Sequence, residues 1–134
     1  MELRNSLYNR GEWIEENGTW RVNITLHSSH VIFQSHFPDE PVMPGVCILQ
    51  IAKELLEDYW NCQLKLIRIK NVKFLSVITP EKHSHISFVL EREDRDSEQE
   101  VRKGEDAEIN VRMHVESGDT IFSKISMTVQ QCKH

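Results

Sequence analysis

The segment that decides the fold reads Ser-His-Phe-Pro-Asp-Glu-Pro-Val-Met-Pro-Gly-Val and spans residues 35–46. Three of its residues are prolines, at positions 38, 41 and 44. Each proline fixes φ and removes a backbone N–H donor, so this segment cannot form the interior of a strand or a helix. We therefore expect a shaped loop beside a titratable histidine, His36, and loops of this kind often carry sites.

The residues that follow the loop predict one long helix, from Val46 to Tyr59. Pro44 and Gly45 precede it, at a position where the missing proline N–H costs little. The first half of this helix is apolar almost all the way round, and polar residues return from Lys53 onward. That pattern predicts burial on most sides of the helix.

The rest of the chain predicts antiparallel strands joined by short turns. Asn17-Gly18 is a strong hairpin signal that can pair residues 12–16 with the strand after it. Residues 116–119 form a second turn signal, and the charged residues 91–108 predict a solvated hairpin tip. One buried helix with five or six such strands is an α+β architecture, with an antiparallel sheet wrapped around a long central helix. The expected strands are residues 20–26, 64–74, 85–91, 107–115 and 120–130.

Length and composition predict one domain over residues 1–134. The formal net charge of −5 argues against nucleic-acid binding. The three cysteines have neither metal-ligand nor redox-pair spacing, which favours a reducing compartment. No apolar run reaches the length of a membrane span, and residues 1–5 do not open a signal peptide, so we expect a cytoplasmic protein without membrane insertion. We expect no cofactor and no metal.

Two motifs carry a family resemblance. His36-Phe37-Pro38, followed by residues 41–46, resembles the signature of the 3-hydroxyacyl-acyl-carrier-protein dehydratases of fatty acid synthesis, which have the hot-dog fold. Residues 71–74 and 77–80 are similar to the strand and proline turn that follow the helix in this family. The similarity extends from Trp20 to Gln130, and its specific part is the first motif.

This resemblance implies the elimination of water from a 3-hydroxyacyl thioester to give the trans-2-enoyl thioester. A histidine removes the α-proton, a carboxylic acid on the central helix protonates the departing hydroxyl, and a backbone N–H at the start of the helix holds the thioester oxygen. The implied substrate is a thioester of acyl carrier protein or coenzyme A. In such dimers the histidine and the acid of one site come from different subunits, and the acyl chain lies along their interface.

The residues that match these roles are His36 as the base and Gly45 as the oxyanion donor. An imidazole can take up a proton at neutral pH, and an N–H at a helix N-terminus lacks an intrahelical partner. Gln50 stands where the family carries its acid. An amide can orient a hydroxyl but has no proton to transfer, and losing a general acid costs on the order of 100- to 10,000-fold in rate. The expected substrate-binding residues are Phe33, Phe37, Pro38, Met43, Pro44 and Val46.

The glutamine leaves several interpretations open. Another acid can substitute: Glu54 lies on the same helix face as Gln50, and Asp39 and Glu40 lie in the loop. Alternatively, a related hot-dog subunit supplies the acid in a heterodimer or a higher assembly. A homodimer that binds the thioester without turnover is a third interpretation, and a thioesterase on the same fold is a fourth. An open edge strand favours at least a dimer in each case.

Two weaker patterns are also present. His83 and His85 are two residues apart on an expected strand and can face the same way, although surface histidines are the simpler interpretation. Residues 64–74 also form a basic strand in an acidic protein, which can receive an acidic carrier protein or its phosphopantetheine phosphate. Its basic residues are Lys65, Arg68, Lys70 and Lys73.

Overall fold

The structure is a computed structural model that describes residues 1–35, 39–95 and 108–132. These residues form one antiparallel sheet and two helices. The elements are β1 (Tyr8–Glu16), β2 (Thr19–Leu26), α1 (Val31–Ser35), α2 (Gly45–Trp60), β3 (Leu64–Phe74), β4 (His85–Arg95), β5 (Glu108–Ser117) and β6 (Thr120–Gln131).

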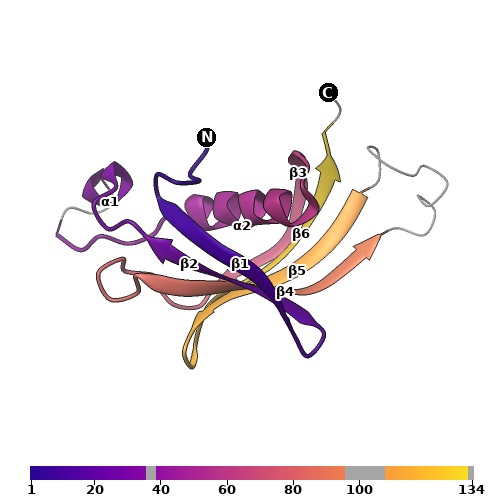
Figure 1. Ribbon diagram of the computed structural model, residues 1–134. Coiled ribbons are helices and arrows are strands. Elements are labelled where there is room, and N and C mark those ends of the chain that lie inside the picture. The colour runs from indigo at the N-terminus through magenta and orange to yellow at the C-terminus, as the bar shows by residue number, and fades with distance from the viewer. Residues whose placement is uncertain (36–38, 96–107, 133–134) are drawn as a thin grey trace.

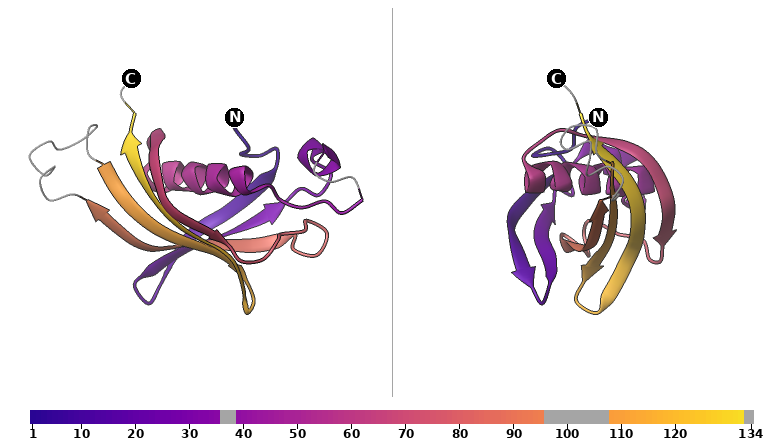
Figure 2. Two further views of the ribbon diagram at one scale, coloured as in Figure 1. Left: turned by 180° about the vertical axis from the view of Figure 1, so that it is seen from behind. Right: turned by 90° about the vertical axis from the view of Figure 1, so that its right-hand side faces the viewer.

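The sheet has six strands in the order β1-β2-β4-β5-β6-β3, and all neighbouring strands are antiparallel. It curves around α2, which lies on its concave side (Figures 1 and 2). The predicted α+β hot-dog architecture is therefore confirmed. The two edge strands of this sheet are β1 and β3.

Both predicted turns are present. Asn17 and Gly18 have φ values of 51° and 85° and join β1 to β2, with Glu16 opposite Thr19. Positive φ at both central residues is the geometry that matches the twist of a two-residue hairpin. The turn between β5 and β6 contains Gly118, at φ 59°.

The core lies between α2 and the concave face of the sheet. One face of α2 contributes Cys47, Ile48, Ile51, Ala52, Leu55 and Leu56, all buried. The opposite face is open in the single chain: Val46 is 64% exposed and Leu49 is only partly buried. The expected burial on most sides is thus wrong for the start of the helix, because an apolar pattern does not specify which chain covers it.

The strand β4 continues to Arg95, beyond the predicted end at residue 91. Its charged residues pair with β5, with Asp94 opposite Asn110 and Arg95 opposite Ile109. Charged residues are typical both of a loop and of a solvent-exposed strand, so the composition alone did not predict that β4 extends this far. Residues 96–107, within the predicted hairpin tip, lie outside the described residues. The short helix α1 was not predicted.

An aromatic cluster joins the C-terminal end of α2 to the β1–β2 hairpin. The ring of Tyr59 lies 4.9 Å from Trp13, 5.5 Å from Trp20 and 5.5 Å from Trp60 between centroids. These three tryptophans are all that the chain contains. No helix among the described residues has the length and apolar character needed to cross a membrane.

Candidate functional site

The N-terminal end of α2 exposes backbone donors beside the proline-rich loop. Pro44 is the N-cap residue, with φ −64° and ψ 143°. The N–H groups of Cys47 and Ile48 donate to the Pro44 carbonyl at 3.0 and 3.2 Å. The N–H groups of Gly45 and Val46 precede this ladder, at the positive end of the helix dipole. Such a group can stabilise negative charge that develops on an oxygen.

A pocket of about 330 Å³ opens at this end of the helix, and we call it the mouth pocket. Its floor is Met43, Gly45 and Ile48, and its wall is the loop from Phe74 to Ile78. The Met43 N–H donates to the Ile78 carbonyl at 2.8 Å, which joins the floor to the wall. The lining is mainly apolar, as an acyl chain requires.

Phe74 lies directly against Gly45. A Cβ atom built at Gly45 would be 2.6 Å from Phe74 Cζ, which is too close for any side chain without movement of the ring. Gly45 is therefore required for this close approach, not for an unusual φ. Sequence reasoning placed Phe74 at the end of a strand and did not assign it to the site. The run of exposed apolar residues after an edge strand, Leu75 and Val77, was the available signal.

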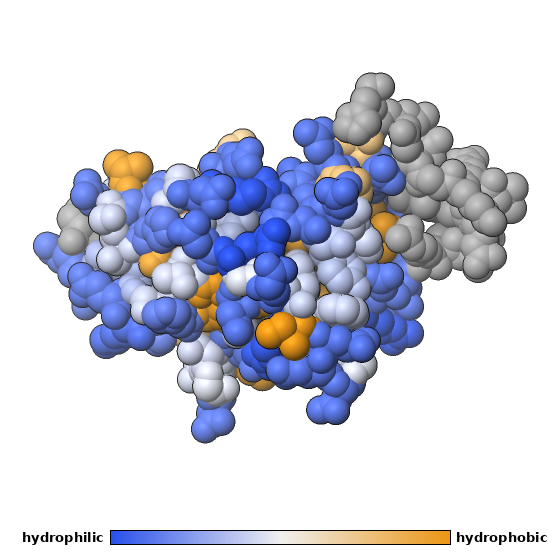
Figure 3. Space-filling view, in the orientation of Figure 1, coloured by the Kyte–Doolittle hydropathy of each residue, from blue (hydrophilic) through white to orange (hydrophobic). Residues whose placement is uncertain are grey.

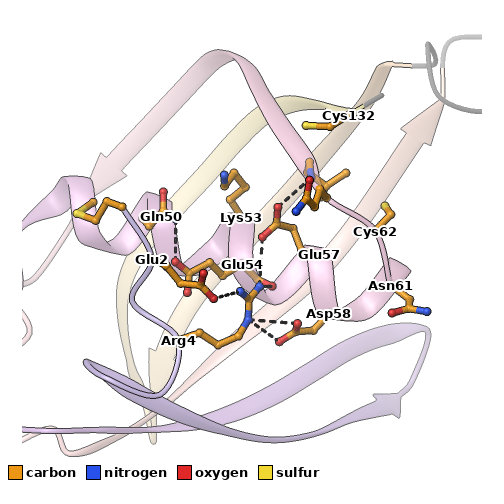
Figure 4. A pocket seen from close by; sticks show the side chains of 13 residues that line it. Glu2, Arg4, Gln50, Lys53, Glu54, Glu57, Asp58, Asn61, Cys62 and Cys132 are labelled. Carbon is orange, nitrogen blue, oxygen red and sulfur yellow. Dashed lines mark hydrogen bonds and ion pairs between the residues drawn. The ribbon is translucent and has the colours of Figure 1, made fainter. Parts of the chain in front are cut away.

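Gln50 and Val46 line a second pocket, of about 410 Å³, which we call the Gln50 pocket. It lies between the open face of α2 and β3, and its wall includes Leu64 and Ile69. Gln50 and Lys53 also border a third and more polar pocket, of about 740 Å³, which is shown in Figure 4. Gly45 and Gln50 therefore line different pockets of the single chain.

Glu54 is the buried carboxylate of the helix, with 1% of its surface exposed. Its Oε2 accepts hydrogen bonds from the Leu3 N–H at 2.8 Å and from Gln50 Nε2 at 2.7 Å. Its Oε1 accepts a third hydrogen bond, from the Tyr8 hydroxyl at 3.0 Å. Burial and the neighbouring Glu54 charge raise the pKa of Tyr8, so the phenol stays a donor. Three donors match the acceptor-only inventory of an ionised carboxylate.

The N-terminal segment covers this carboxylate and is held by Arg4. The Arg4 guanidinium donates to the Glu54 carbonyl at 2.9 Å and pairs with Glu57 at 3.2 Å and Asp58 at 3.3 Å. Figure 4 shows these carboxylates converging on Arg4, and Figure 3 shows that this face of the molecule is mostly hydrophilic. This network covers α2 at Glu54, Glu57 and Asp58, whereas the N-terminal end of the helix is open.

Three predicted site residues, His36, Phe37 and Pro38, lie outside the described residues, and their roles stay predictions. Phe33 lies in α1 and is 1% exposed within the core; it lines neither the mouth pocket nor the Gln50 pocket. Met43 and Gly45 share the mouth pocket, as just described. Cys47 behaves as a small core residue, because burial raises the pKa of its thiol.

The weaker candidates are largely engaged elsewhere. Asp39 and Glu40 are exposed and line neither pocket. His83 lies before β4, and its Nδ1 accepts the Thr79 N–H at 3.1 Å. Among the described residues, no group of three or more His, Cys, Asp or Glu could hold a metal ion. On β3, Arg68 pairs with Glu108 at 3.2 Å. The three lysines of that strand, Lys65, Lys70 and Lys73, are exposed.

Comparison with known families adds an independent result. The model of the ApeI-like family, described as ApeI dehydratase, matches residues 12–123. The chain belongs to the ApeI-like dehydratase family. Sequence relatives include 3-hydroxyacyl-[acyl-carrier-protein] dehydratases FabZ from Rickettsia typhi and Rickettsia massiliae. Each is 30% identical over 79 residues, which is 53% of this chain and 53% of the relative. The chain thus matches about half the length of these relatives.

Solved structures share the fold of this ApeI-like chain. The dehydratase heterocomplex ApeI:P from Xenorhabdus doucetiae aligns with a TM-score of 0.61 at 15% identity, covering 92% of this chain and 95% of that chain. An uncharacterized protein from Erwinia carotovora subsp. atroseptica aligns with a TM-score of 0.57 at 19% identity, covering 92% and 93%. These alignments confirm the fold, and the family match confirms the dehydratase resemblance.

Proposed function

We propose that this chain is a subunit of a 3-hydroxyacyl-[acyl-carrier-protein] dehydratase, to which it contributes His36 as the base and Gly45 as the oxyanion donor. The observation that carries the proposal is the mouth pocket, where an apolar cavity meets the first-turn N–H groups of α2. In the sequence, the His36-Phe37-Pro38 motif lies five residues before Met43, the first residue that lines this pocket. Membership of a dehydratase family and the names of the FabZ relatives support the reaction and the carrier.

In the proposed reaction, His36 takes the α-proton of the thioester. Negative charge then develops on the thioester oxygen, where the Gly45 N–H stabilises it. The bond between C3 and the hydroxyl oxygen breaks, the hydroxyl receives a proton and leaves as water, and the trans-2-enoyl thioester remains. The last proton needs an acid at the position that faces the hydroxyl.

The described residues of this chain offer that proton poorly. Gln50 is an amide, and Asp39 and Glu40 line neither pocket. The Glu54 carboxylate lies beneath the N-terminal segment and already accepts three hydrogen bonds, so it is not placed to protonate a substrate. We assign the acid to a related hot-dog subunit that packs on the open face of α2. The separation of Gly45 and Gln50 into two pockets supports a site shared between chains, and the ApeI:P relative is a heterocomplex.

The test is turnover of a 3-hydroxyacyl-acyl-carrier-protein thioester by the native assembly and by the isolated chain. We expect the assembly purified from native cells to contain a second hot-dog chain and to form the enoyl product, while the isolated chain is at least about 100-fold slower. His36→Ala in this chain should abolish turnover by the assembly, and His85→Ala is the matched control. A native assembly that is inactive, or one indifferent to His36→Ala, contradicts the proposal.

A single exchange tests the missing acid directly. In Gln50→Glu the new carboxyl group takes the place of an amide that lies 2.7 Å from Glu54. Two carboxyl groups that lie this close do not both ionise easily, so one of the pair should hold its proton more tightly and be a better general acid at neutral pH than an isolated carboxyl group. We expect the isolated chain to gain activity when two copies pair, because the new carboxyl group of one copy then faces the base of the other. If the variant binds the thioester without a gain in turnover, the chain is a subunit that binds the thioester but does not convert it. This is the second candidate function, and the amide at position 50 favours it.

A further inference from the structure

The hydrogen bond between Gln50 and Glu54 gives the Gln50 amide one defined orientation. A carboxylate can only accept hydrogen bonds, whereas an amide has one donating end and one accepting end. Gln50 Nε2 lies 2.7 Å from Glu54 Oε2, so the donating end of the amide faces Glu54. The accepting end, Oε1, must then face the other way.

The open space lies on that other side. Gln50 lines both the Gln50 pocket and the larger polar pocket beside it. Figure 4 shows the Gln50 side chain standing above Glu54, with its oxygen directed away from the carboxylate. Position 50 therefore presents a carbonyl oxygen to the pocket, and this orientation is set by the residue one turn further along the helix.

Glu54 is rigid enough to impose this orientation. It is 1% exposed and receives two further hydrogen bonds from outside the helix, from the Leu3 N–H and the Tyr8 hydroxyl. Both of these donors belong to the N-terminal part of the chain, which Arg4 holds in place. The Glu54 carboxylate only accepts hydrogen bonds. A Gln50 amide turned by about 180° would therefore place its oxygen against a carboxylate oxygen, and the two oxygens would repel each other.

We propose that Glu54 is a positioning residue that makes Gln50 a hydrogen-bond acceptor, so that position 50 selects thioesters with a 3-hydroxyl over those with a 3-oxo group. A hydroxyl can donate to the Gln50 oxygen, whereas a ketone has no proton to donate and meets it with another acceptor. The inference rests on the proposed function, because it assumes that an acyl thioester enters beside position 50.

The experiment compares the affinities of the intact chain for three pantetheine thioesters: octanoyl, 3-hydroxyoctanoyl and 3-oxooctanoyl. One neutral hydrogen bond contributes about 0.5–1.5 kcal/mol, so we expect about twofold to twelvefold tighter binding of the 3-hydroxy compound than of the 3-oxo compound. In Glu54→Gln the new amide can donate to Gln50, which frees Gln50 to turn, and the preference should fall to near unity. Glu81→Gln, at an exposed position away from both pockets, is the matched control and should keep it.

Two further variants separate orientation from folding. Tyr8→Phe removes a hydrogen bond from Glu54 but leaves its contact with Gln50, so it should lower stability while keeping the preference. Gln50→Leu leaves the other two donors of Glu54 in place and should lose the preference even if Glu54→Gln does not fold. A preference that survives Gln50→Leu, or one that survives Glu54→Gln in a folded protein, overturns the inference.

The outcome also distinguishes this inference from the proposed function. If all three thioesters bind with equal affinity, thioester binding stands and the role of Gln50 is wrong. If none of the three binds to the assembly or to the isolated chain, the proposed function fails first.

Discussion

Two regions of α2, its start at Gly45 and the part around Glu54, differ in how far the rest of the chain covers them. At its start, Val46 is 64% exposed, Gly45 lies under the Phe74 ring, and apolar surface faces an open pocket. Two turns later, Glu54 is closed beneath the N-terminal segment and each of its oxygens is hydrogen-bonded. One helix thus has both a closed region and an open apolar surface.

The closed region contains polar contacts that satisfy both carboxylate oxygens of Glu54. Two buried donors, the Leu3 N–H and the Tyr8 hydroxyl, and the part-buried Gln50 amide converge on one carboxylate, and losing it would leave the two buried donors unpaired. The open region depends instead on shape, since Phe74 and Gly45 meet without any polar contact. Variants in the two regions should therefore lose different properties.

The largest loss of stability is expected for Glu54→Leu. Each of the two buried donors costs about 1–3 kcal/mol when it is left without an acceptor, so we expect a loss of about 2 kcal/mol or more in the free energy of unfolding. Urea titration measures the loss, and Glu81→Leu at an exposed position is the control. A loss below about 1 kcal/mol would show that the closed region is not the polar anchor described here.

Val46→Asp should affect association and leave the protomer intact. An acidic residue in the first turn of a helix is favourable, so the free energy of unfolding of the protomer should stay within about 0.5 kcal/mol. Burying an unpaired charge in an interface should weaken association by about 2 kcal/mol or more. Analytical ultracentrifugation over a concentration series measures this, with Val31→Asp, also an exposed valine, for comparison. Unchanged association would mean that the open face of α2 is not covered by a second chain.

A double-mutant cycle tests the contact between Gly45 and Phe74. Gly45→Ala should destabilise the wild-type chain by about 1 kcal/mol, because the new methyl group overlaps the ring. In the Phe74→Ala background the same exchange should be neutral or stabilising, since alanine is the better helix former. The reversal of sign, measured by thermal unfolding of the four proteins, is the signature of direct coupling. Equal effects in both backgrounds would contradict the contact.

Tyr8→Phe should have the smallest effect at neutral pH, about 1 kcal/mol, from one lost hydrogen bond. Its pH dependence is more informative. Burial and the Glu54 charge raise the pKa of Tyr8 in the folded state, so the stabilisation is complete below the ordinary tyrosine pKa of about 10 and is lost as pH rises above it. Unfolding free energies at increasing alkaline pH should fall less steeply for Tyr8→Phe than for the wild type. Glu81→Gln, at an exposed position, is the comparison and should fall as steeply as the wild type.

Much of this fold could be predicted from local pattern. The helix was expected at residues 46–59 and spans Gly45–Trp60, and the Asn17-Gly18 turn lies where its dipeptide signal predicted. The spacing that put Gln50 and Glu54 on one helix face is confirmed by their hydrogen bond. These successes share a cause, because each depends on residues within one or two turns of one another.

The parts that could not be predicted depend on residues far apart in the chain. Phe74 reaches Gly45 across a helix and a strand, and Leu3 and Tyr8 reach Glu54 from the other end of the molecule. The hydrophobic periodicity of a sequence reports local structure and does not predict contacts between distant residues. For the same reason, Glu54 as a substitute acid looked plausible from spacing alone, and only the three donors around it argue against that role.

The location of the three tryptophans has a practical consequence. Trp13, Trp20 and Trp60 all pack at the hairpin end of the helix, beside Tyr59. Tryptophan fluorescence of this chain is therefore a local probe. It reports unfolding where the β1–β2 hairpin packs on α2 and is insensitive to changes around Gly45. A ligand that enters beside Gly45 should leave the emission spectrum almost unchanged, so its arrival must be followed by calorimetry or by a label placed at that end.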